Sequence, residues 1–385
     1  MRILFSSPSA VGHIHTMLPL AQQLQTRGHE VRWATGLDNT GRLDRAGIQS
    51  HPAGLAHATM MAVYHSRYPE ADSLPPKERR PHMLAKMFGA VATAPMLADM
   101  LQLTESWCPD LLVHDAIEFA AAIVATKIGA PHVTHSFGAI VPTELVRLAA
   151  TEVAALWAGE GLTPDPLAGA YQHLYLDIYP PSMQLPDIVN AGRRQLLRPV
   201  TADVVGGGES PESPVRRGPR PLIYLTFGTV QNRASALHSA VTALAALEVD
   251  LLVTIGSDRD PAEFGPQPPN VRLERYVAQA LILDHCALVV SHAGSGTLLA
   301  ALARGIPHLC LPQAADQFVN SAAASAAGAA IGLAPADAEP AAIAAAAHRL
   351  LDENSFRAAA AAIASEIAAM PDSTVAAEVA LELVG

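Results

Sequence analysis

Cysteine is scarce in this chain, and the three cysteines present form no recognisable site. Cys108, Cys286 and Cys310 are far apart, odd in number and outside CxxC spacing. This excludes a disulfide framework and a compact thiolate metal cluster, and it is typical of reduced core thiols in an intracellular protein. We therefore expect a cytoplasmic protein.

Basic charge and long apolar runs are also scarce. The 25 Lys and Arg residues are outnumbered by 36 Asp and Glu, giving a net charge of −11 with no block of one sign. Nucleic acid is excluded as a partner because it requires a basic face. No uninterrupted, strongly apolar run approaches the ~20 residues of a membrane span, so we expect no such span. The N-terminus, MRILFSSPSAVGH, also lacks the basic and apolar regions of a secretion signal.

The composition instead favours a large buried core. Half of the 385 residues are hydrophobic and only 16% are charged, which fits two or three domains. Strand-like runs alternate with helical patterns in the first half, which predicts a parallel sheet covered by helices on both faces. Strands are expected at 2–7, 30–36, 48–53, 110–115 and 131–136, and helices at 14–27 and 117–128. Between 55 and 107 the pattern is helical and irregular, with a loop at 69–81, and 143–200 is helical and interrupted by prolines.

A second alternating region follows GGGESPESPVRRGPRP, residues 206–221, whose composition is typical of a linker. Strands are expected at 222–227, 250–256, 270–276, 287–292 and 308–312, and helices at 234–248, 295–304 and 317–327, before an Ala-rich helical tail. We predict an α/β protein with two Rossmann-like, doubly wound domains facing across a cleft. The predicted parts are an N-terminal domain (1–205), a linker (206–220), a C-terminal domain (221–368) and a C-terminal helix that packs back on the N-terminal domain (369–385).

Ligands of such sheets bind at the carboxyl ends of the strands, and the most informative strand end carries SHAGSGT, residues 291–297. Gly294 and Gly296 allow a close backbone approach, Ser295 and Thr297 offer hydroxyls, and His292 can add a proton donor. Backbone amides at a helix start favour an anion such as a phosphate. An ordinary strand-to-helix turn is the structural alternative. The pattern is neither GxGxxG nor a P-loop, so no dinucleotide or Walker-type site is indicated.

Two further strand ends carry candidate ligand residues. In PQAADQ, residues 312–317, Asp316 and Gln317 suit the hydroxyls of a sugar, although Asp316 could simply cap a helix. In TFGT, residues 226–229, Gly228 and Thr229 permit close approach and offer a hydroxyl, although a plain turn fits equally well.

The first strand end carries two histidines, His13 and His15. At positions i and i+2 of a helix start they point apart, and no third ligand is near, which argues against a metal. A single histidine suits a general base, given an orienting carboxylate. Asp115 is the better candidate because it ends a strand at the same sheet edge, and Glu118 is the weaker one. A capping or solvated histidine is the alternative.

A DRD triplet, 258–260, is a short match to the DxD signature of metal-dependent sugar transferases. Asp and Pro at 260–261 also indicate a turn, and chance matches to so short a motif are frequent.

Together these segments resemble the bacterial family 1 glycosyltransferases of the GT-B fold, which decorate antibiotics and other natural products. The likeness is carried by RILFSSPSAVGHIHTMLPLAQQLQTRGHEVRWATG, PDLLVHDAIEFAAAIVATKIGAP, LIYLTFGT and LILDHCALVVSHAGSGTLLAALARGIPHLCLPQAADQFVNSAA. Two departures stand out: where HHGGSGT is common in the family this chain has Ser291 and Ala293, and Ala278 replaces a usual proline. An extra methyl at Ala293 would crowd the backbone if its φ must be positive.

The resemblance implies an inverting, metal-free transfer of a sugar, with a deoxysugar favoured, from a dTDP- or UDP-sugar to a hydroxyl of an apolar aglycone such as a polyketide, macrolide or enediyne. No cofactor is expected, and a homodimer is left open. The implied catalytic residues are His13 and Asp115. The implied donor-binding residues are Gly228, Thr229, Tyr276, Val277, Gln279, His292, Gly294, Ser295, Gly296, Thr297, Asp316 and Gln317. An epimerase of the same fold and a non-catalytic auxiliary protein are the alternatives.

Overall fold

The computed structural model describes residues 1–200, 218–228, 234–256 and 259–385. Its contacts divide the chain into two compact units. The N-terminal unit comprises Met1–Tyr179, Leu185–Arg198 and Met370–Gly385, and the C-terminal unit comprises Pro180–Gln184 and Pro199–Ala369. Of the predicted linker, 206–220, only 218–220 lie within the described residues.

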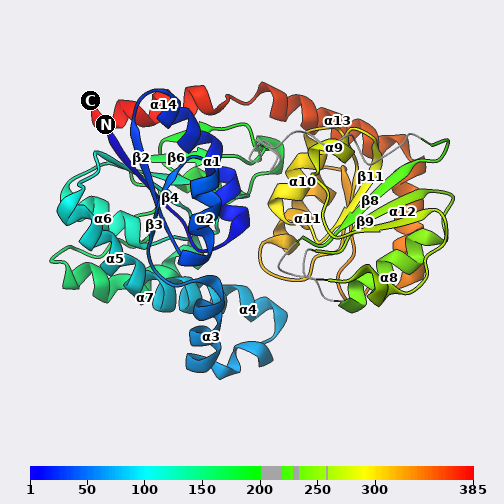
Figure 1. Cartoon of the computed structure of the whole chain (residues 1–385), viewed down its shortest axis with the longest axis horizontal. Coiled ribbons are helices and arrows are strands. Elements are labelled where there is room, and N and C mark those ends of the chain that lie inside the picture. The colour runs from blue at the N-terminus through cyan, green and yellow to red at the C-terminus, as the bar shows by residue number, and fades with distance from the viewer. Residues whose placement is uncertain (201–217, 229–233, 257–258) are drawn as a thin grey trace. The chain divides into compact units, whose positions relative to one another are not determined.

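The N-terminal unit is built on a seven-stranded sheet in which every pair is parallel, in the order β3-β2-β1-β4-β5-β6-β7. The strands are β1 (Arg2–Ser6), β2 (Glu30–Thr35), β3 (Gln49–Pro52), β4 (Leu111–Asp115), β5 (His132–His135), β6 (Leu174–Asp177) and β7 (Arg194–Leu196). Its α-helices are α1 (Val11–Thr26), α2 (Leu37–Arg45), α3 (His57–Arg67), α4 (Pro76–His82), α5 (Thr93–Ser106), α6 (Ala120–Ile128), α7 (Thr143–Gly159) and α14 (Ser373–Leu381). Although α14 lies near the C-terminus, it packs against α1 near the N-terminus (Figure 1).

The C-terminal unit has a six-stranded parallel sheet in the order β10-β9-β8-β11-β12-β13. Its strands are β8 (Leu222–Thr226), β9 (Asp250–Thr254), β10 (Val271–Glu274), β11 (Cys286–Ser291), β12 (His308–Cys310) and β13 (Ala330–Gly332). Its α-helices are α8 (Ala234–Ala245), α9 (Ala280–Leu283), α10 (Ser295–Leu302), α11 (Gln317–Ala326), α12 (Pro340–Asp352) and α13 (Asn354–Ala369).

Alternation along each strand decides which core layer a residue joins. In β8, Ile223 and Leu225 pack with residues of α8 and α12, whereas Tyr224 packs on the opposite face with residues of α9 and α10. Figure 1 shows α8 and α12 on one side of this sheet and α10 on the other. Both faces of the strands are therefore buried, as the nearly continuous apolar run LIYLT requires.

The strand and helix predictions are confirmed for most elements, but three strands were not predicted. Strands β6 and β7 lie in the region expected to be helical, and β13 lies between two predicted helices. These strands have only three or four residues, too few for a period to emerge. The predicted loop at 69–81 is also wrong in part, because Pro69–Ser73 forms a 3₁₀ helix and Pro76–His82 forms α4.

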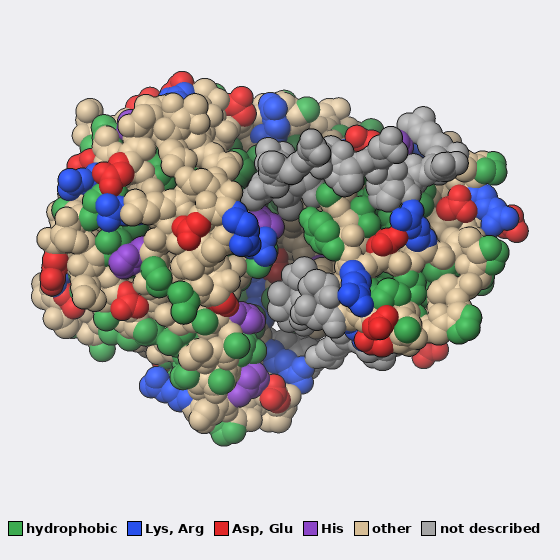
Figure 2. Space-filling view, in the orientation of Figure 1, with side chains coloured by type: hydrophobic (Ala, Val, Ile, Leu, Met, Phe, Trp, Pro, Cys, Tyr) green, Lys and Arg blue, Asp and Glu red, His purple; other side chains and the backbone are tan. Residues whose placement is uncertain are grey.

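Between α4 and α5 the chain forms a π-helical segment, Met83–Ala92. The combined helix, Glu78–Ser106, is the one helix among the described residues long and apolar enough to cross a membrane, and half of its most apolar stretch is buried inside the protein. It packs against α6 and α7, as core helices do. On the face that Figure 2 shows, acidic and basic side chains are interspersed over the described residues of each unit.

Candidate active site

In the N-terminal unit, His13 meets a buried carboxylate. Its Nδ1 atom lies 2.8 Å from Oδ2 of Asp115, the last residue of β4. The two residues meet because β4 pairs directly with β1, so that their carboxyl ends share one edge of the sheet. Asp115 is fully buried, whereas the His13 side chain is 18% exposed. A carboxylate on Nδ1 fixes the imidazole tautomer and leaves Nε2 as the basic atom.

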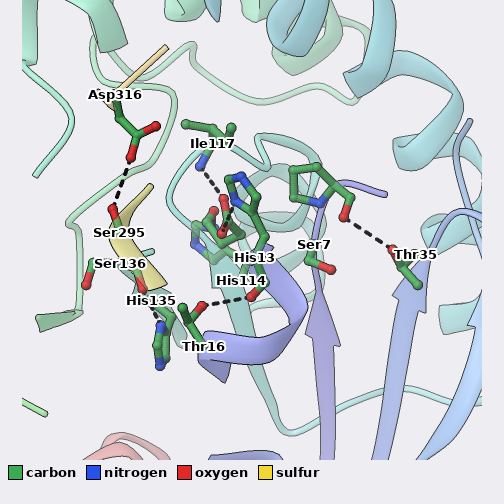
Figure 3. A network of polar contacts seen from close by, with 12 residues as sticks. Ser7, His13, Thr16, Thr35, His114, Ile117, His135, Ser136, Ser295 and Asp316 are labelled. Carbon is green, nitrogen blue, oxygen red and sulfur yellow. Dashed lines mark hydrogen bonds and ion pairs between the residues drawn. The ribbon is translucent and has the colours of Figure 1, made fainter. Parts of the chain in front are cut away.

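Backbone contacts hold both partners in place (Figure 3). Oδ1 of Asp115 accepts a hydrogen bond from Ile117 N at 2.9 Å, which fixes the second carboxylate oxygen. The Thr16 hydroxyl donates to the carbonyl of His13 at 2.8 Å. The Phe137 ring lies 4.3 Å from the His13 ring, centroid to centroid, and restricts its rotation. Sequence reasoning missed Phe137, because nothing in the sequence marks a residue that follows β5 as a neighbour of α1.

The other two candidates from this strand edge have separate surroundings. His15 points to Arg42, with 3.5 Å between Nε2 and Nη1, and burial together with this guanidinium lowers its pKa to about 4. The two histidines therefore have different partners, as their spacing predicted. Glu118 does not orient His13. It is buried, and its carboxylate accepts hydrogen bonds from Ser6 Oγ and from the first amides of α6. Burial raises the Glu118 pKa.

In the C-terminal unit, the SHAGSGT turn connects β11 to α10. The first helical hydrogen bond runs from Leu298 N to Gly294 O, so the amides of residues 295–297 have no acceptor within the helix. The imidazole of His292 lies against two glycines. A Cβ atom on Gly294 would be 2.6 Å from its Nε2 atom, and one on Gly228 would be 2.9 Å from its Cε1 atom. Burial lowers the pKa of His292, while the nearby Asp316 opposes the shift.

Asp316 and the turn are joined by hydrogen bonds. Ser295 Oγ donates to Asp316 Oδ2 at 3.0 Å (Figure 3), and Asn320 Nδ2 donates to the same oxygen at 2.9 Å. Gln317 folds back on its own loop, where its Oε1 atom accepts the amides of Gln313 and Ala314 at 2.7 and 2.9 Å. Asn320 was missed by sequence reasoning, although its position one helical turn after Asp316 is the signal that could have found it.

The residues expected near a nucleotide base have varied surroundings. Tyr276 is 71% exposed, and Val277 packs against the core cluster that contains Tyr224. Gln279 Nε2 donates a hydrogen bond to Thr297 Oγ1 at 3.1 Å. This bond joins two residues that were predicted to bind the nucleotide-sugar. Gly228 has a φ of +67°, whereas Thr229 falls outside the described residues.

No cluster of three or more His, Cys, Asp or Glu side chains suited to a metal ion occurs within residues 1–200, 218–228, 234–256 and 259–385. Of the DRD triplet, Asp258 lies outside these ranges. Asp260 caps the 3₁₀ helix Pro261–Phe264 by accepting the Ala262 amide at 3.0 Å. The turn interpretation of Asp260 is thereby confirmed.

The comparisons with known proteins identify the class to which this fold and these strand ends belong. Residues 22–198 match the N-terminal domain, and residues 238–384 the C-terminal domain, of the family described as erythromycin biosynthesis protein CIII-like. The structure is also similar to the glycosyltransferase VinC, solved in complex with dTDP, with a TM-score of 0.83, 25% identity and coverage of 100% of this chain and 99% of VinC. The fold is therefore GT-B.

Two curated relatives match along nearly the whole chain. The L-demethylnoviosyl transferase of Streptomyces niveus is 31% identical, with 98% of this chain and 97% of the relative covered. The elloramycin glycosyltransferase ElmGT of Streptomyces olivaceus is 32% identical, with 96% and 94% covered. This chain belongs to the erythromycin biosynthesis protein CIII-like family of bacterial natural-product glycosyltransferases.

Proposed function

We propose that this protein transfers a deoxysugar from a dTDP-sugar to a hydroxyl of an apolar natural-product aglycone, with inversion and without a metal. The observation that carries the proposal is the 2.8 Å contact between His13 Nδ1 and the fully buried Asp115 carboxylate at the carboxyl edge of a parallel sheet. The choice of dTDP over UDP is supported by the VinC complex with dTDP.

In the proposed reaction, His13 Nε2 takes the proton of the acceptor hydroxyl while the oxygen of that hydroxyl attacks the anomeric carbon of the sugar. The bond from that carbon to the diphosphate oxygen breaks, and the diphosphate leaves with the electron pair. General base catalysis of this kind contributes typically ~10²–10⁴-fold. The buried Asp115 stabilises the imidazolium that forms.

The same proposal assigns the leaving diphosphate to the C-terminal unit. The amides at the start of α10 and the side chain of His292 are held in place by the fold. They can therefore stabilise the negative charge that develops on the leaving diphosphate without reorganising. Asp316 and Gln317 are assigned to the hydroxyls of the sugar. Both side chains form hydrogen bonds with protein groups in the structure, so binding would exchange those hydrogen bonds for bonds to the sugar.

The test is transfer itself. The protein is incubated with a panel of dTDP- and UDP-sugars and of apolar hydroxylated aglycones, and products are detected by mass spectrometry. A H13A variant should lose transfer by about 10²–10⁴-fold and retain dTDP affinity, because the base contributes to the chemical step. H29A is the matched control, since His29 follows α1 at its other end. Full turnover by H13A would contradict the assignment of the base, and isomerised donor in the absence of acceptor would favour an epimerase.

A further inference from the structure

The SHAGSGT turn contains a strained residue. Ala293 has a φ of +64°, in the left-handed region, and is completely buried. A side chain with a Cβ atom disfavours this region by roughly 5- to 30-fold in population. Ala293 therefore does not hold this conformation by its own preference, and the surrounding residues must impose it.

One side of Ala293 is held through its amide. Ala293 N donates to Ser291 Oγ at 3.0 Å, and the same hydroxyl lies 2.7 Å from His308 Nε2 on the neighbouring strand β12. Both side chains are fully buried. Burial lowers the pKa of His308 to about 3, with a further contribution from His292, so the ring is neutral at ordinary pH.

The direction of the Ser291–His308 bond follows from the count of buried polar groups. If the Ser291 hydroxyl donates to Nε2, its oxygen is an acceptor for Ala293 N, and only the His308 Nδ1–H remains without a partner. If Nε2–H donates instead, both the Ser291 hydroxyl proton and the Nδ1 lone pair remain unsatisfied. His308 Nδ1 is a buried atom with no partner among the described residues, which both arrangements accommodate. The first leaves fewer unpaired groups and is the arrangement that burial favours.

The other side of Ala293 is held through its carbonyl. Asn320 Nδ2 donates to Ala293 O at 3.0 Å and also lies 3.0 Å from Ser295 Oγ. Asn320 is fully buried on α11, and the same amide group contacts Asp316. Side chains from β11, β12 and α11 therefore fix both peptide groups of a single left-handed residue.

We infer that Ser291, His308 and Asn320 form a buried clamp that holds Ala293 left-handed and so pre-organises the turn for a nucleoside diphosphate. These are positioning residues, because they act through the backbone of the turn and not on the ligand. The identity of the ligand rests on the proposed function, whereas the clamping of Ala293 does not depend on it. Pre-organisation of this kind increases affinity by removing the cost of ordering the loop at binding.

The test uses glycine to make the clamp unnecessary. S291A removes the acceptor of the Ala293 amide, so the amides of residues 291–297 should exchange with deuterium roughly 5- to 30-fold faster, which is the population penalty of the left-handed alanine. The Kd for dTDP should rise by a similar factor. A293G accepts the left-handed region freely and should leave Kd within about threefold. In S291A/A293G, exchange and Kd should both return to within about threefold of the A293G values.

A second arm tests His308. H308L removes the group that orients the Ser291 hydroxyl, so S291A/H308L should be no worse than S291A alone, since both changes act through one oxygen. S321A is the matched control. Ser321 is a buried serine of the same unit that lies on α11, whereas the side-chain hydrogen bonds to the peptide groups of Ala293 come from Ser291 and Asn320. The exchange of 291–297 and the Kd in S321A should therefore match those of the unmodified protein.

The outcomes separate the clamp from the proposed function. If glycine at 293 fails to rescue S291A, or if S291A leaves the exchange of 291–297 unchanged, the clamp is wrong. If the exchange behaves as expected but dTDP binds neither the unmodified protein nor A293G, the clamp stands and the assigned ligand is wrong.

Discussion

The two units differ in the kind of group that their candidate sites present: mainly side chains in the N-terminal unit and mainly backbone in the C-terminal unit. In the N-terminal unit the titratable groups on β4 and β5 and in the turn after β4 are buried side chains. Asp115, Glu118, His114, His132 and His135 are all less than a tenth exposed and lie on two neighbouring strands and the turn after one of them. In the C-terminal unit the candidate site is largely backbone, formed by a left-handed alanine, two glycines around an imidazole and the start of a helix.

This difference fits what the two proposed roles would require. Moving a proton requires a side chain with a controlled pKa and tautomer, and burial beside a carboxylate supplies both. Holding a diphosphate requires several donors aimed at one place, which backbone amides provide without titrating. We therefore expect changes at N-terminal side chains to alter catalysis and acid stability, and changes of backbone conformation in the C-terminal unit to alter ligand binding.

The largest expected effect is that of D115N. An asparagine keeps the shape of the aspartate side chain but carries no charge to stabilise an imidazolium. Its NH₂ group can also face Nδ1 in place of an acceptor oxygen, which would favour the wrong tautomer. Transfer should therefore fall by about 10²–10⁴-fold. The Kd for dTDP, measured by calorimetry, should stay within about threefold. D110N is the matched control, because Asp110 precedes β4 at its other end and accepts the Arg2 amide at 2.8 Å. Equal turnover by D115N and D110N would remove the distinction between the units.

The next effect is acid instability of the N-terminal unit. Burial lowers the pKa of His114 to about 4, of His132 to about 3 and of His135 to about 4, whereas the unfolded chain protonates near 6.5. Below pH 6.5 the unfolded state therefore binds more protons than the folded state. The stability contributed by each neutral ring falls as the pH drops, by up to about 2 kcal/mol per histidine at pH 5.

In the C-terminal unit, burial lowers the pKa of His308 to about 3 and lowers that of His292 as well. Fewer buried imidazoles predict that this unit loses less stability in acid. The three tryptophans, Trp33, Trp107 and Trp157, all lie in the N-terminal unit, so their fluorescence reports its unfolding alone. During titration from pH 7 to 4.5, the fluorescence transition should precede loss of the far-ultraviolet circular dichroism. In H132Q the fluorescence transition should shift to lower pH. An unchanged transition pH in this variant would count against the buried histidines as the cause of the acid unfolding.

Much of the site was predictable because it follows from strand ends. The contact of His13 with Asp115 was predicted from two strands that share an edge. For Ala293, the sequence indicated only that its methyl group would crowd the backbone if φ were positive, and the structure shows a φ of +64°. The residues that contact His13 and the SHAGSGT turn from neighbouring strands and loops were not predictable. Phe137 and His308 come from loops and strands whose neighbours are set by the order of strands in the sheet, which no single local pattern contains. Strand β7 was missed for a related reason, since three residues carry no period.

The smallest expected effects come from two glycines of the same turn, and they have opposite signs. Gly294 has a φ of −62°, so alanine fits its backbone, but the new Cβ would lie 2.6 Å from His292 Nε2. G294A should therefore destabilise the C-terminal unit by about 1–3 kcal/mol, the usual cost of overpacking.

A Cβ on Gly296 would meet nothing within 4 Å, and the residue lies in α10. G296A should stabilise the unit by about 0.5–1 kcal/mol through helix propensity. Urea unfolding of the two variants, followed by circular dichroism, checks both signs. A loss of stability in G296A equal to that in G294A would show that the turn responds to any added methyl group, and that contact with His292 is not what makes glycine necessary at 294.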